Sequence, residues 1–513
     1  MQTSQRRLAA GPGEKVGSGA RLTDILRLAF WFSIVVSLLN YGANDPITVA
    51  IETAFVYLLL VLAVISAGIA GNVRTPVVLS LVVLLILLAW IVFQTAPLPE
   101  GWPVHPAWLE VRKLNPDVHA SISVTPGDDL GAYLKIALPF GVFMLSLLLF
   151  RRDGEAERAL RLYGVAGGVI AILSILQFVF APRMLLFVEK TAYLDSLTGF
   201  FVNRNTAATF FGIVSLLLLT LLWRSTKDVD FRRFLSTLAQ PRPQAKGWSV
   251  ERRQGLFYAG LLAASLLALL MTKSRAGVGL TFVSLSLLGI LLGSTRYSRT
   301  QRASFASRPK VGIARRLGLL VGLPLIFLVI LAVLGGNVLL RAEVRGAEDP
   351  RFCTLPGIVA SVKDHFPWGS GLASFQEVFP AYRDPACGVF ATWDKAHNVY
   401  LEGTLTLGIM FPLVAVIVMG SLVHILVRGI RERREYRFAA CLGLAALLLV
   451  ALHSAVDFSL QIPGFSLVFA LLMGPVVSIC LGRATGAVSP SDQRGSGRYR
   501  IRSSHGHRKS ENA

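Results

Sequence analysis

Apolar residues along this chain are gathered into long runs that short polar segments separate. A helix needs about 20 apolar residues to cross about 30 Å of hydrocarbon with every backbone group paired internally. Twelve runs meet that length, so we expect an all-α, polytopic membrane protein with about 12 transmembrane helices. The predicted spans cover residues 23–41, 47–70, 76–94, 132–150, 161–180, 205–223, 255–273, 276–294, 317–340, 405–427, 438–456 and 463–482.

The overall composition agrees with this pattern. Of 513 residues, 53% are hydrophobic and only 16% are charged, which is too apolar for a soluble protein of this size. No repeat of fixed period divides the chain, so we expect one membrane domain over 23–482, preceded by a tail at 1–22. The tail at 483–513 is rich in Ser, Gly and Arg and is expected to be disordered.

The distribution of basic residues predicts the topology. Arg6, Arg7, Lys15 and Arg21 precede the first run and no small-residue cleavage site follows it, so we expect a retained span with a cytoplasmic N-terminus. If the spans alternate, most of the 51 Lys and Arg residues fall on the same side, and both termini are cytoplasmic. The net charge of +21 then reflects topology and attraction to membrane lipids. Nucleic acid is not an expected partner, because the basic residues are scattered with few aromatic neighbours.

Alternation leaves three sizeable segments on the outer side, at 95–131, 181–204 and 341–397. The third is the most polar and holds two of the four cysteines. In an oxidising compartment Cys353 and Cys387 would form a disulfide worth about 3–4 kcal/mol, and otherwise they are two unpaired thiols. Cys441 and Cys480 fall inside spans, where Cys behaves as a small apolar residue.

Two arginines lie at the outer ends of spans, against the charge rule. Arg275 follows Ser274 in a tight hairpin, and Arg204 lies between Asn203 and Asn205 where a span begins. Such a guanidinium either snorkels to the membrane surface or binds an anion. It suits phosphate because it stays charged and binds two oxygens at once, and a helix N-terminus also favours an anion.

His397 lies just before a predicted helix start at the outer membrane boundary. An imidazole there can act as a base or orient a hydrogen-bonding group near neutral pH, or it can merely cap the helix. His453 and Asp457 are four residues apart, which predicts a hydrogen bond on one helical face. No Cys/His cluster has zinc spacing and no Walker or Rossmann pattern occurs, so we expect neither a metal nor a cofactor.

Five segments together resemble the O-antigen ligase and polysaccharide polymerase superfamily of bacterial inner-membrane glycosyltransferases. The resemblance covers roughly 76–480, and the order of the segments is more specific than any one of them. The segments are Pro97-Leu98-Pro99, Asn203-Arg204-Asn205, Ser274-Arg275-Ala276-Gly277, the pair Trp368-Gly369-Ser370-Gly371-Leu372-Ala373-Ser374-Phe375 with His397-Asn398-Val399-Tyr400-Leu401-Glu402, and His453-Ser454-Ala455-Val456-Asp457-Phe458-Ser459-Leu460-Gln461-Ile462-Pro463.

The resemblance implies a GT-C-like helical fold in the bacterial inner membrane and a metal-independent glycosyltransferase without cofactors. It implies transfer of a glycan from an undecaprenyl-diphosphate carrier to an acceptor hydroxyl on the periplasmic side. The acceptor is lipid A core in an O-antigen ligase, and another carrier-linked glycan in a polymerase of exopolysaccharide or other surface polysaccharide. Both acceptors stay open, as do other polysaccharide-assembly proteins as partners.

By the same resemblance His397 lies at the reacting centre, as a base or as a positioner of the acceptor. Arg204 and Arg275 contact the diphosphate and stabilise the leaving group. Two positions matter for the match: Thr206 stands where many relatives have His, and Ala373 is the third small residue of the glycine pattern. The accessory candidates are Asn203, Asn205, Lys395, Asn398, Tyr400 and Glu402.

A transporter or flippase for lipid-linked glycans would explain twelve spans equally well. It predicts charged residues along a path through the bilayer, whereas the Arg and His residues singled out here fall at one face. A non-catalytic partner in polysaccharide assembly is a third interpretation, for which the sequence offers nothing positive.

Overall fold

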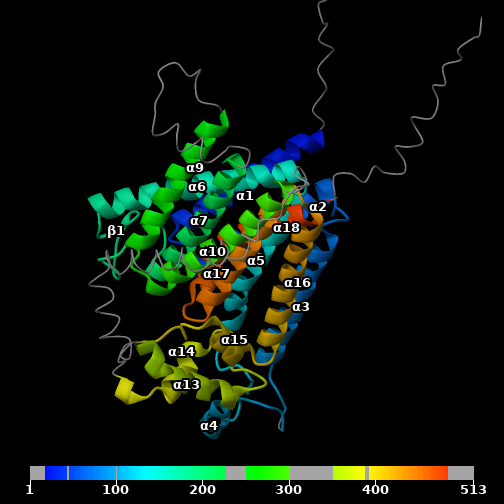
Figure 1. Cartoon of the computed structure of the whole chain (residues 1–513). Coiled ribbons are helices and arrows are strands. Elements are labelled where there is room, and N and C mark those ends of the chain that lie inside the picture. Colours follow the sequence, from blue (N-terminus) through cyan, green and yellow to red (C-terminus); the bar gives the residue numbers. More distant parts are fainter. Residues whose placement is uncertain are drawn as a thin grey trace, which may run out of the picture.

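The computed structural model describes residues 18–42, 45–99, 101–226, 250–300, 350–387 and 392–482 (Figure 1). Within these ranges, eleven helices are long and apolar enough to cross a membrane. They are α1 (Ser18–Leu39), α2 (Pro46–Ala67), α3 (Arg74–Thr95), α5 (Asp129–Leu149), α6 (Asp153–Phe180), α7 (Arg204–Thr226), α9 (Val250–Met271), α10 (Arg275–Thr300), α16 (Met410–Glu432), α17 (Arg437–Ser454) and α18 (Pro463–Leu481).

These helices confirm an all-α, multi-pass membrane protein and correspond to eleven of the twelve predicted spans. The remaining span, 317–340, lies outside the described residues, and so do the tails at 1–17 and 483–513. The strands of the described part are β1 (Met184–Leu185) and β2 (Val188–Glu189), which pair antiparallel in a short hairpin before α7.

Two helices differ in extent from the predicted spans. The span expected at 405–427 is divided into α15 (Val399–Leu407) and α16, because the chain turns at Gly408 with a φ of 58°. A Cβ atom at Gly408 would lie 2.0 Å from the carbonyl oxygen of Pro367, so only glycine fits this turn. The polar stretch before the expected span 161–180 is itself helical, and α6 runs for 28 residues from Asp153. Asp153 and Glu155 in its first turn suit a helix N-terminus.

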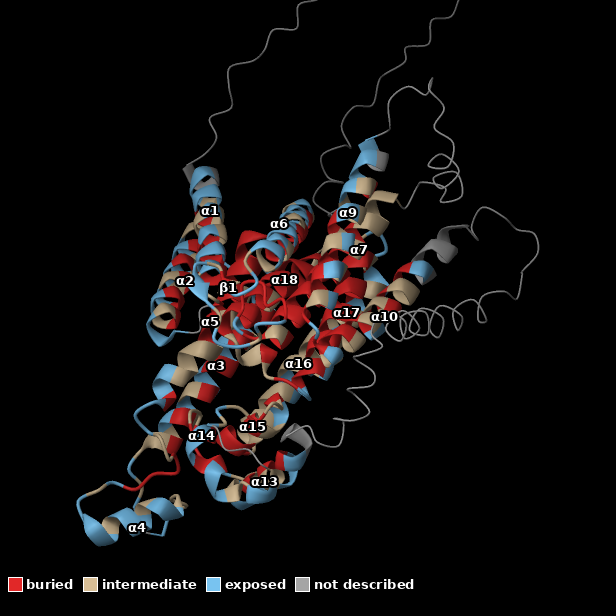
Figure 2. Cartoon of the chain, turned by 90° about the vertical axis from the view of Figure 1, so that its left-hand side faces the viewer, coloured by how far each residue is buried: buried red, intermediate tan, exposed pale blue. Residues whose placement is uncertain are grey.

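The core of the bundle is formed by α7, α17 and α18, whose side chains are buried over most of their length (Figure 2). Phe210, Phe211 and Phe465 are among the largest side chains that are fully enclosed there. By contrast, few residues of α16 are buried, and the rest are partly or fully exposed. Such a surface is compatible with lipid and not with water, which agrees with a helix at the margin of a membrane bundle.

Connections between the helices meet at one end of the bundle, which we call the loop end. The α1–α2 turn contacts the α17–α18 turn, since Gly464 N donates to Gly42 O at 2.7 Å. The α6–α7 segment contacts the end of α9, since Leu197 N donates to Met271 O at 3.0 Å. Asn205 at the start of α7 bonds Asp457 in the α17–α18 turn. The α3–α5 segment bonds Ser370, and Asn398, further along the chain from Ser370, bonds Ala455 at the end of α17. Five connections (α1–α2, α3–α5, α6–α7, α9–α10 and α17–α18) are therefore on one side, as alternating spans require.

The opposite end is rich in arginine. Arg27 pairs with Glu155 at 2.7 Å, and the buried Arg433 pairs with Asp153. Arg224 pairs with Glu157 at 3.3 Å. This distribution of charge is the one expected of the cytoplasmic side.

A small helical module covers part of the loop end (Figure 1, lower part). We call the described residues of 350–407 the cap: α13 (Pro350–His365), α14 (Phe375–Val378), the 3₁₀ turns η1 (Phe379–Tyr382) and η2 (Pro385–Cys387), and α15. A disulfide joins Cys353 to Cys387, with 5.6 Å between their Cα atoms. Ile358, Phe375, Phe379 and Leu405 form a separate small core.

The cap is attached to the bundle by hydrogen bonds to the end of α3 and to the 95–131 segment. Gln94 Nε2 donates to the carbonyls of Trp368 and Thr406 at 2.8 and 2.9 Å. Val124 N donates to Ser370 O at 2.9 Å, and Ala373 N donates to Asp129 Oδ1 at 2.8 Å. The predicted outer loop is therefore a folded module that is fixed to α3 and α5.

Candidate functional site

Arg204 and Arg275 are the first residues of two neighbouring helices at the loop end. α7 begins at Arg204 and α10 begins at Arg275. The two starts are linked directly, because Ser274 Oγ donates to Asn205 Oδ1 at 2.8 Å. Each N-terminus carries a partial positive charge from its unpaired N–H groups, so two such ends and two guanidinium groups raise the positive potential together.

The guanidinium of Arg204 is positioned by the α6–α7 segment. Its Nη1 donates to Ser196 Oγ at 3.4 Å, and its Cζ lies 5.3 Å from the centre of the Tyr193 ring. Its Nε is buried without a hydrogen-bond partner in the described structure. Neither contact neutralises the charge, so the group is oriented and remains cationic.

Arg275 is exposed at the loop end. Among the described residues, no carboxylate pairs with it, whereas the adjacent Lys273 pairs with Asp195 at 3.2 Å. The two cations of this turn therefore differ: Lys273 is satisfied by the protein, and Arg275 is available to an anion or to the membrane surface.

Asn205 organises the residues beneath the two arginines. Its Nδ2 donates to Asp457 Oδ2 at 2.6 Å, while its Oδ1 accepts from Ser274. Asn203 Oδ1 accepts from the Asn205 backbone N–H at 2.7 Å and caps α7. Because both ends of the Asn205 amide are used inside the protein, this accessory candidate positions its neighbours and does not face a ligand.

His453 and Asp457 were predicted to share one helical face, and that part of the prediction was wrong. α17 ends at Ser454, so the two residues do not share a helical face. His453 Nδ1 lies 2.6 Å from Thr209 Oγ1, and Asp457 Oδ1 accepts from Ser459 Oγ at 2.8 Å. Ser459 Oγ is also 3.4 Å from His453 Nδ1, so it connects the two side chains.

His397 lies in the cap and contacts the α17–α18 turn. Its ring centre is 5.3 Å from that of Trp393 and 5.0 Å, edge to face, from that of Phe458. Its Nδ1 is 3.1 Å from the carbonyl oxygen of Lys395. A carbonyl only accepts, so Nδ1 carries the proton in the neutral ring and Nε2 is the basic nitrogen. The backbone at His397 has a φ of 54°, in the left-handed region.

The accessory residues around His397 hold this turn in place. Asn398 caps α15 by accepting from the N–H groups of Tyr400 and Leu401, and its Nδ2 donates to Ala455 O at 2.9 Å. Tyr400 Oη donates to Ala451 O at 2.8 Å. Both bonds attach α15 to the end of α17, and so they fix the cap over the loop end.

The buried Glu402 pairs with the partly exposed Lys395, two residues before His397. Glu402 Oε2 accepts from Ala396 N at 2.7 Å, and Oε1 is 3.5 Å from Lys395 Nζ. Burial raises the pKa of the Glu402 carboxyl, while Lys395 and the Ala396 N–H act in the opposite direction. Lys395 is therefore committed to a carboxylate, which makes it a weaker anion ligand than either arginine.

A continuous series of contacts brings the predicted site residues to one region. The ring of His397 contacts that of Phe458, and the preceding residue, Asp457, accepts a hydrogen bond from Asn205. Asn205 follows Arg204 in the chain and accepts a hydrogen bond from Ser274, which precedes Arg275. The segments that carry Arg204, Arg275 and His397 are far apart in the sequence but adjacent in the structure. The sequence predicted only that they lie on the same side of the membrane.

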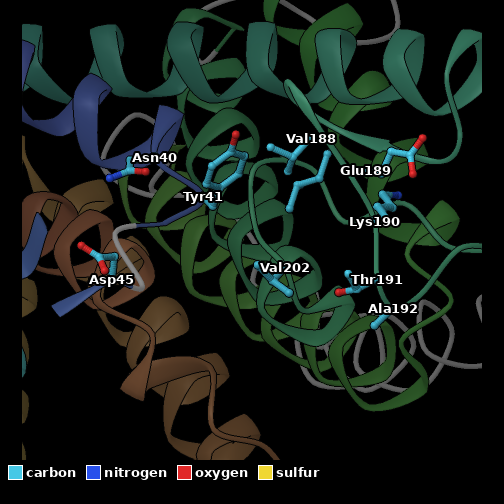
Figure 3. A pocket seen from close by; sticks show the side chains of 10 residues that line it. Asn40, Tyr41, Asp45, Val188, Glu189, Lys190, Thr191, Ala192 and Val202 are labelled. Atoms are coloured by element: carbon cyan, nitrogen blue, oxygen red, sulfur yellow. The ribbon is translucent and has the colours of Figure 1, made fainter. Parts of the chain in front are cut away.

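The structure also contains features that sequence reasoning missed. A cavity of about 430 Å³ lies between the α1–α2 turn and the β1–β2 hairpin (Figure 3). A pair of histidines, His105 and His365, joins the 95–131 segment to α13, with 2.9 Å between their Nε2 atoms. The cavity and the histidine pair are each formed by segments that are distant in the chain. Hydrophobic periodicity does not predict such tertiary contacts.

In the described part of the chain, no group of three or more His, Cys, Asp or Glu residues is placed to hold a metal ion. Comparison of the whole chain with protein-family models and with curated proteins finds no match.

Proposed function

We propose that this chain is an inner-membrane glycosyltransferase with a GT-C-like fold and both termini in the cytoplasm. It moves a glycan from an undecaprenyl-diphosphate carrier to an acceptor hydroxyl on the periplasmic side. The observation that carries the proposal is the pair of uncompensated arginines, Arg204 and Arg275, at two adjoining helix starts beside the turn that holds His397.

The chemistry follows from these groups. The acceptor oxygen attacks the anomeric carbon of the donor sugar while the bond from that carbon to the diphosphate oxygen breaks. Arg204 and Arg275 stabilise the negative charge that develops on the leaving diphosphate. Nε2 of His397 takes the proton from the acceptor hydroxyl, and Nδ1 keeps its bond to Lys395 O.

The placement of cysteines and arginines supports the compartment. The disulfide of the cap suits an oxidising periplasm, and the arginine-rich end suits the cytoplasm. A flippase would use its cations along a path through the bilayer, so the position of both arginines at one end favours the transferase. The acceptor is either lipid A core or a second carrier-linked glycan.

Reconstitution in liposomes with a carrier-linked oligosaccharide tests the proposal. We expect Arg204→Ala to slow transfer by about 10²–10³-fold, as for loss of one donor to a developing anion. His397→Ala should slow it by about 10²–10⁴-fold, as for loss of a general base. Lys363→Ala, which removes an exposed cation of the cap, is the control and should keep the wild-type rate.

Wild-type rates in both site variants would refute the mechanism. Supplying either lipid A core or a second carrier-linked glycan as the acceptor distinguishes a ligase from a polymerase.

A further inference from the structure

The cavity at the loop end has the size and composition of a ligand site. Its volume of about 430 Å³ falls within the range of small-molecule pockets, about 300–1,000 Å³. In Figure 3, Tyr41 and Val188 border the space on one side and Thr191 borders it on the other. The walls therefore combine an aromatic ring, an aliphatic surface and a hydroxyl group.

The charged groups of the wall indicate which ligand chemistry fits. Asp45 and Glu189 are exposed carboxylates that only accept hydrogen bonds. Asp45 Oδ2 already accepts from the backbone N–H and the hydroxyl of Thr48 at 3.0 and 3.2 Å, so Asp45 Oδ1 and the Glu189 carboxylate are the acceptors that suit a donating ligand. Lys190 is already engaged: its Nζ donates to Ser196 O at 3.1 Å and lies 5.4 Å from the centre of the Phe178 ring. Two carboxylates against one committed ammonium disfavour a phosphate or any other anion.

An uncharged sugar satisfies these requirements. Its hydroxyl groups donate to carboxylates and exchange hydrogen bonds with a hydroxyl such as that of Thr191. They also donate to the amide oxygen of Asn40, whose Nδ2 is bonded to Thr48 Oγ1 at 2.7 Å. Its C–H face packs against an aromatic ring and aliphatic side chains, here those of Tyr41 and Val188. We infer that this cavity is a saccharide subsite that binds uncharged sugar residues of a glycan.

The cavity lies close to the site of the proposed reaction. That its sugars belong to the transferred or accepting glycan rests on the proposed function. The segment from Lys190 to Ser196 borders the cavity with its first residues, and Tyr193 and Ser196 of the same segment contact Arg204. Val202, two residues before Arg204, forms another part of the wall. Sugars in the cavity are thus one loop away from a diphosphate held by Arg204. They belong either to the donor or to the acceptor glycan.

Site-directed labelling tests the subsite without an activity assay. Cys441 and Cys480 are buried and Cys353 is bonded to Cys387, so Thr191→Cys introduces the one accessible thiol among the described residues. The reaction of this thiol with a maleimide is followed in liposomes. The probes are carrier-linked oligosaccharide from the cells that make the protein, undecaprenyl diphosphate without sugar, and phosphatidylethanolamine.

Of these three probes, we expect only the carrier-linked oligosaccharide to protect Thr191→Cys. At a ligand concentration of ten times Kd, labelling should slow by about tenfold, because only the unoccupied fraction reacts. Phe187→Cys, on the exposed tip of the same hairpin, is the control and should react at one rate throughout. Protection by sugar-free carrier or by phosphatidylethanolamine, or no protection by any glycan, overturns the inference.

A second pair of variants separates the two sources of sugar. Val188→Trp fills the cavity, and Phe187→Trp places the same residue outside it. We expect Val188→Trp to raise the KM of one substrate, donor or acceptor, on the order of tenfold with little change in kcat. The substrate whose KM rises is the one whose sugar occupies the cavity. Equal KM values in the two variants contradict the subsite. If glycan protects Thr191→Cys while the wild-type protein transfers nothing, the subsite stands and the proposed function fails.

Discussion

At the scale of single residues, Asn205 shows how the site is kept in order. Its amide donates to Asp457 and accepts from Ser274, so one side chain connects α7, the α9–α10 turn and the α17–α18 turn. Asn205 and Asp457 are both buried, and a buried polar group that loses its partner costs about 1–3 kcal/mol. The positions of the two arginines therefore depend on a residue that touches no substrate.

Replacing Asn205 should lower stability. We expect Asn205→Ala to reduce the free energy of unfolding by about 1–3 kcal/mol, because Asp457 loses a donor in a buried site. Asn205→Asp has nearly the same shape but places a second carboxylate against Asp457, so its loss should be larger at neutral pH and smaller in acid. Thermal unfolding in detergent measures both. Unchanged midpoints in both variants would show that the bond contributes nothing.

At the scale of elements, the sequence was sufficient to predict the membrane-spanning helices but not the fold of the cap. Apolar length alone located α2, α3 and α18, because the membrane imposes that length whatever the helices contact. It missed the break at Gly408, which results from close approach to Pro367, a residue in another part of the cap. The order of the spans also placed His397, Arg204 and Arg275 on one side of the membrane, but it did not predict that their segments are in contact. That contact depends on Asn205 and Phe458, whose contacts are tertiary.

The histidine pair makes the docking of α4 (Pro106–Leu114) sensitive to pH. Ala107 N donates to His105 Nδ1, and His365 Nδ1 faces the carbonyl of Ser361, so in the neutral pair His105 Nε2 donates to His365 Nε2. Burial, then the charge of His365, lowers the pKa of His105 from 6.5 to about 4. Tyr382 also faces His365, edge to ring.

Because the pKa of docked His105 is lowered, the undocked form binds the proton more readily. Docking should be fully stable above pH 6.5 and weaken progressively as the pH falls from 6.5 towards 4. The protection factors of residues 106–114, which compare each measured exchange rate with the intrinsic rate at the same pH, should fall over that window. His105→Asn keeps an N-cap but cannot titrate, so its protection factors should not fall in this way. Identical pH profiles for the two proteins would contradict the role of the pair.

At the scale of the whole molecule, the two ends of the bundle differ in structure and in charge. One end gathers five connections, the cap and its disulfide, and the other gathers paired arginines. This asymmetry predicts the orientation in the membrane. The two arginines without a carboxylate partner, Arg204 and Arg275, belong to the first end, where a carrier lipid in the outer leaflet would present its diphosphate.

Labelling of single cysteines in intact cells checks that orientation. Gln376 is exposed on the cap, and Gly154 is exposed at the start of α6 on the other end. We expect an impermeant maleimide to label Gln376→Cys in cells with only the outer membrane opened. Gly154→Cys should react only after the inner membrane is permeabilised. The reverse pattern would invert the topology and remove the site from the periplasm.

The most direct test of the central claim compares two cations in one turn. Arg275 has no carboxylate partner among the described residues, whereas Lys273, two residues earlier, is paired with Asp195. The measurement is the initial rate at which undecaprenyl diphosphate is released from a carrier-linked oligosaccharide in liposomes that contain an acceptor. We predict that Arg275→Ala lowers this rate by about 10²–10³-fold, while Lys273→Ala leaves it within a few-fold of wild type. Equal rates for the two variants would contradict an arginine site for the leaving diphosphate.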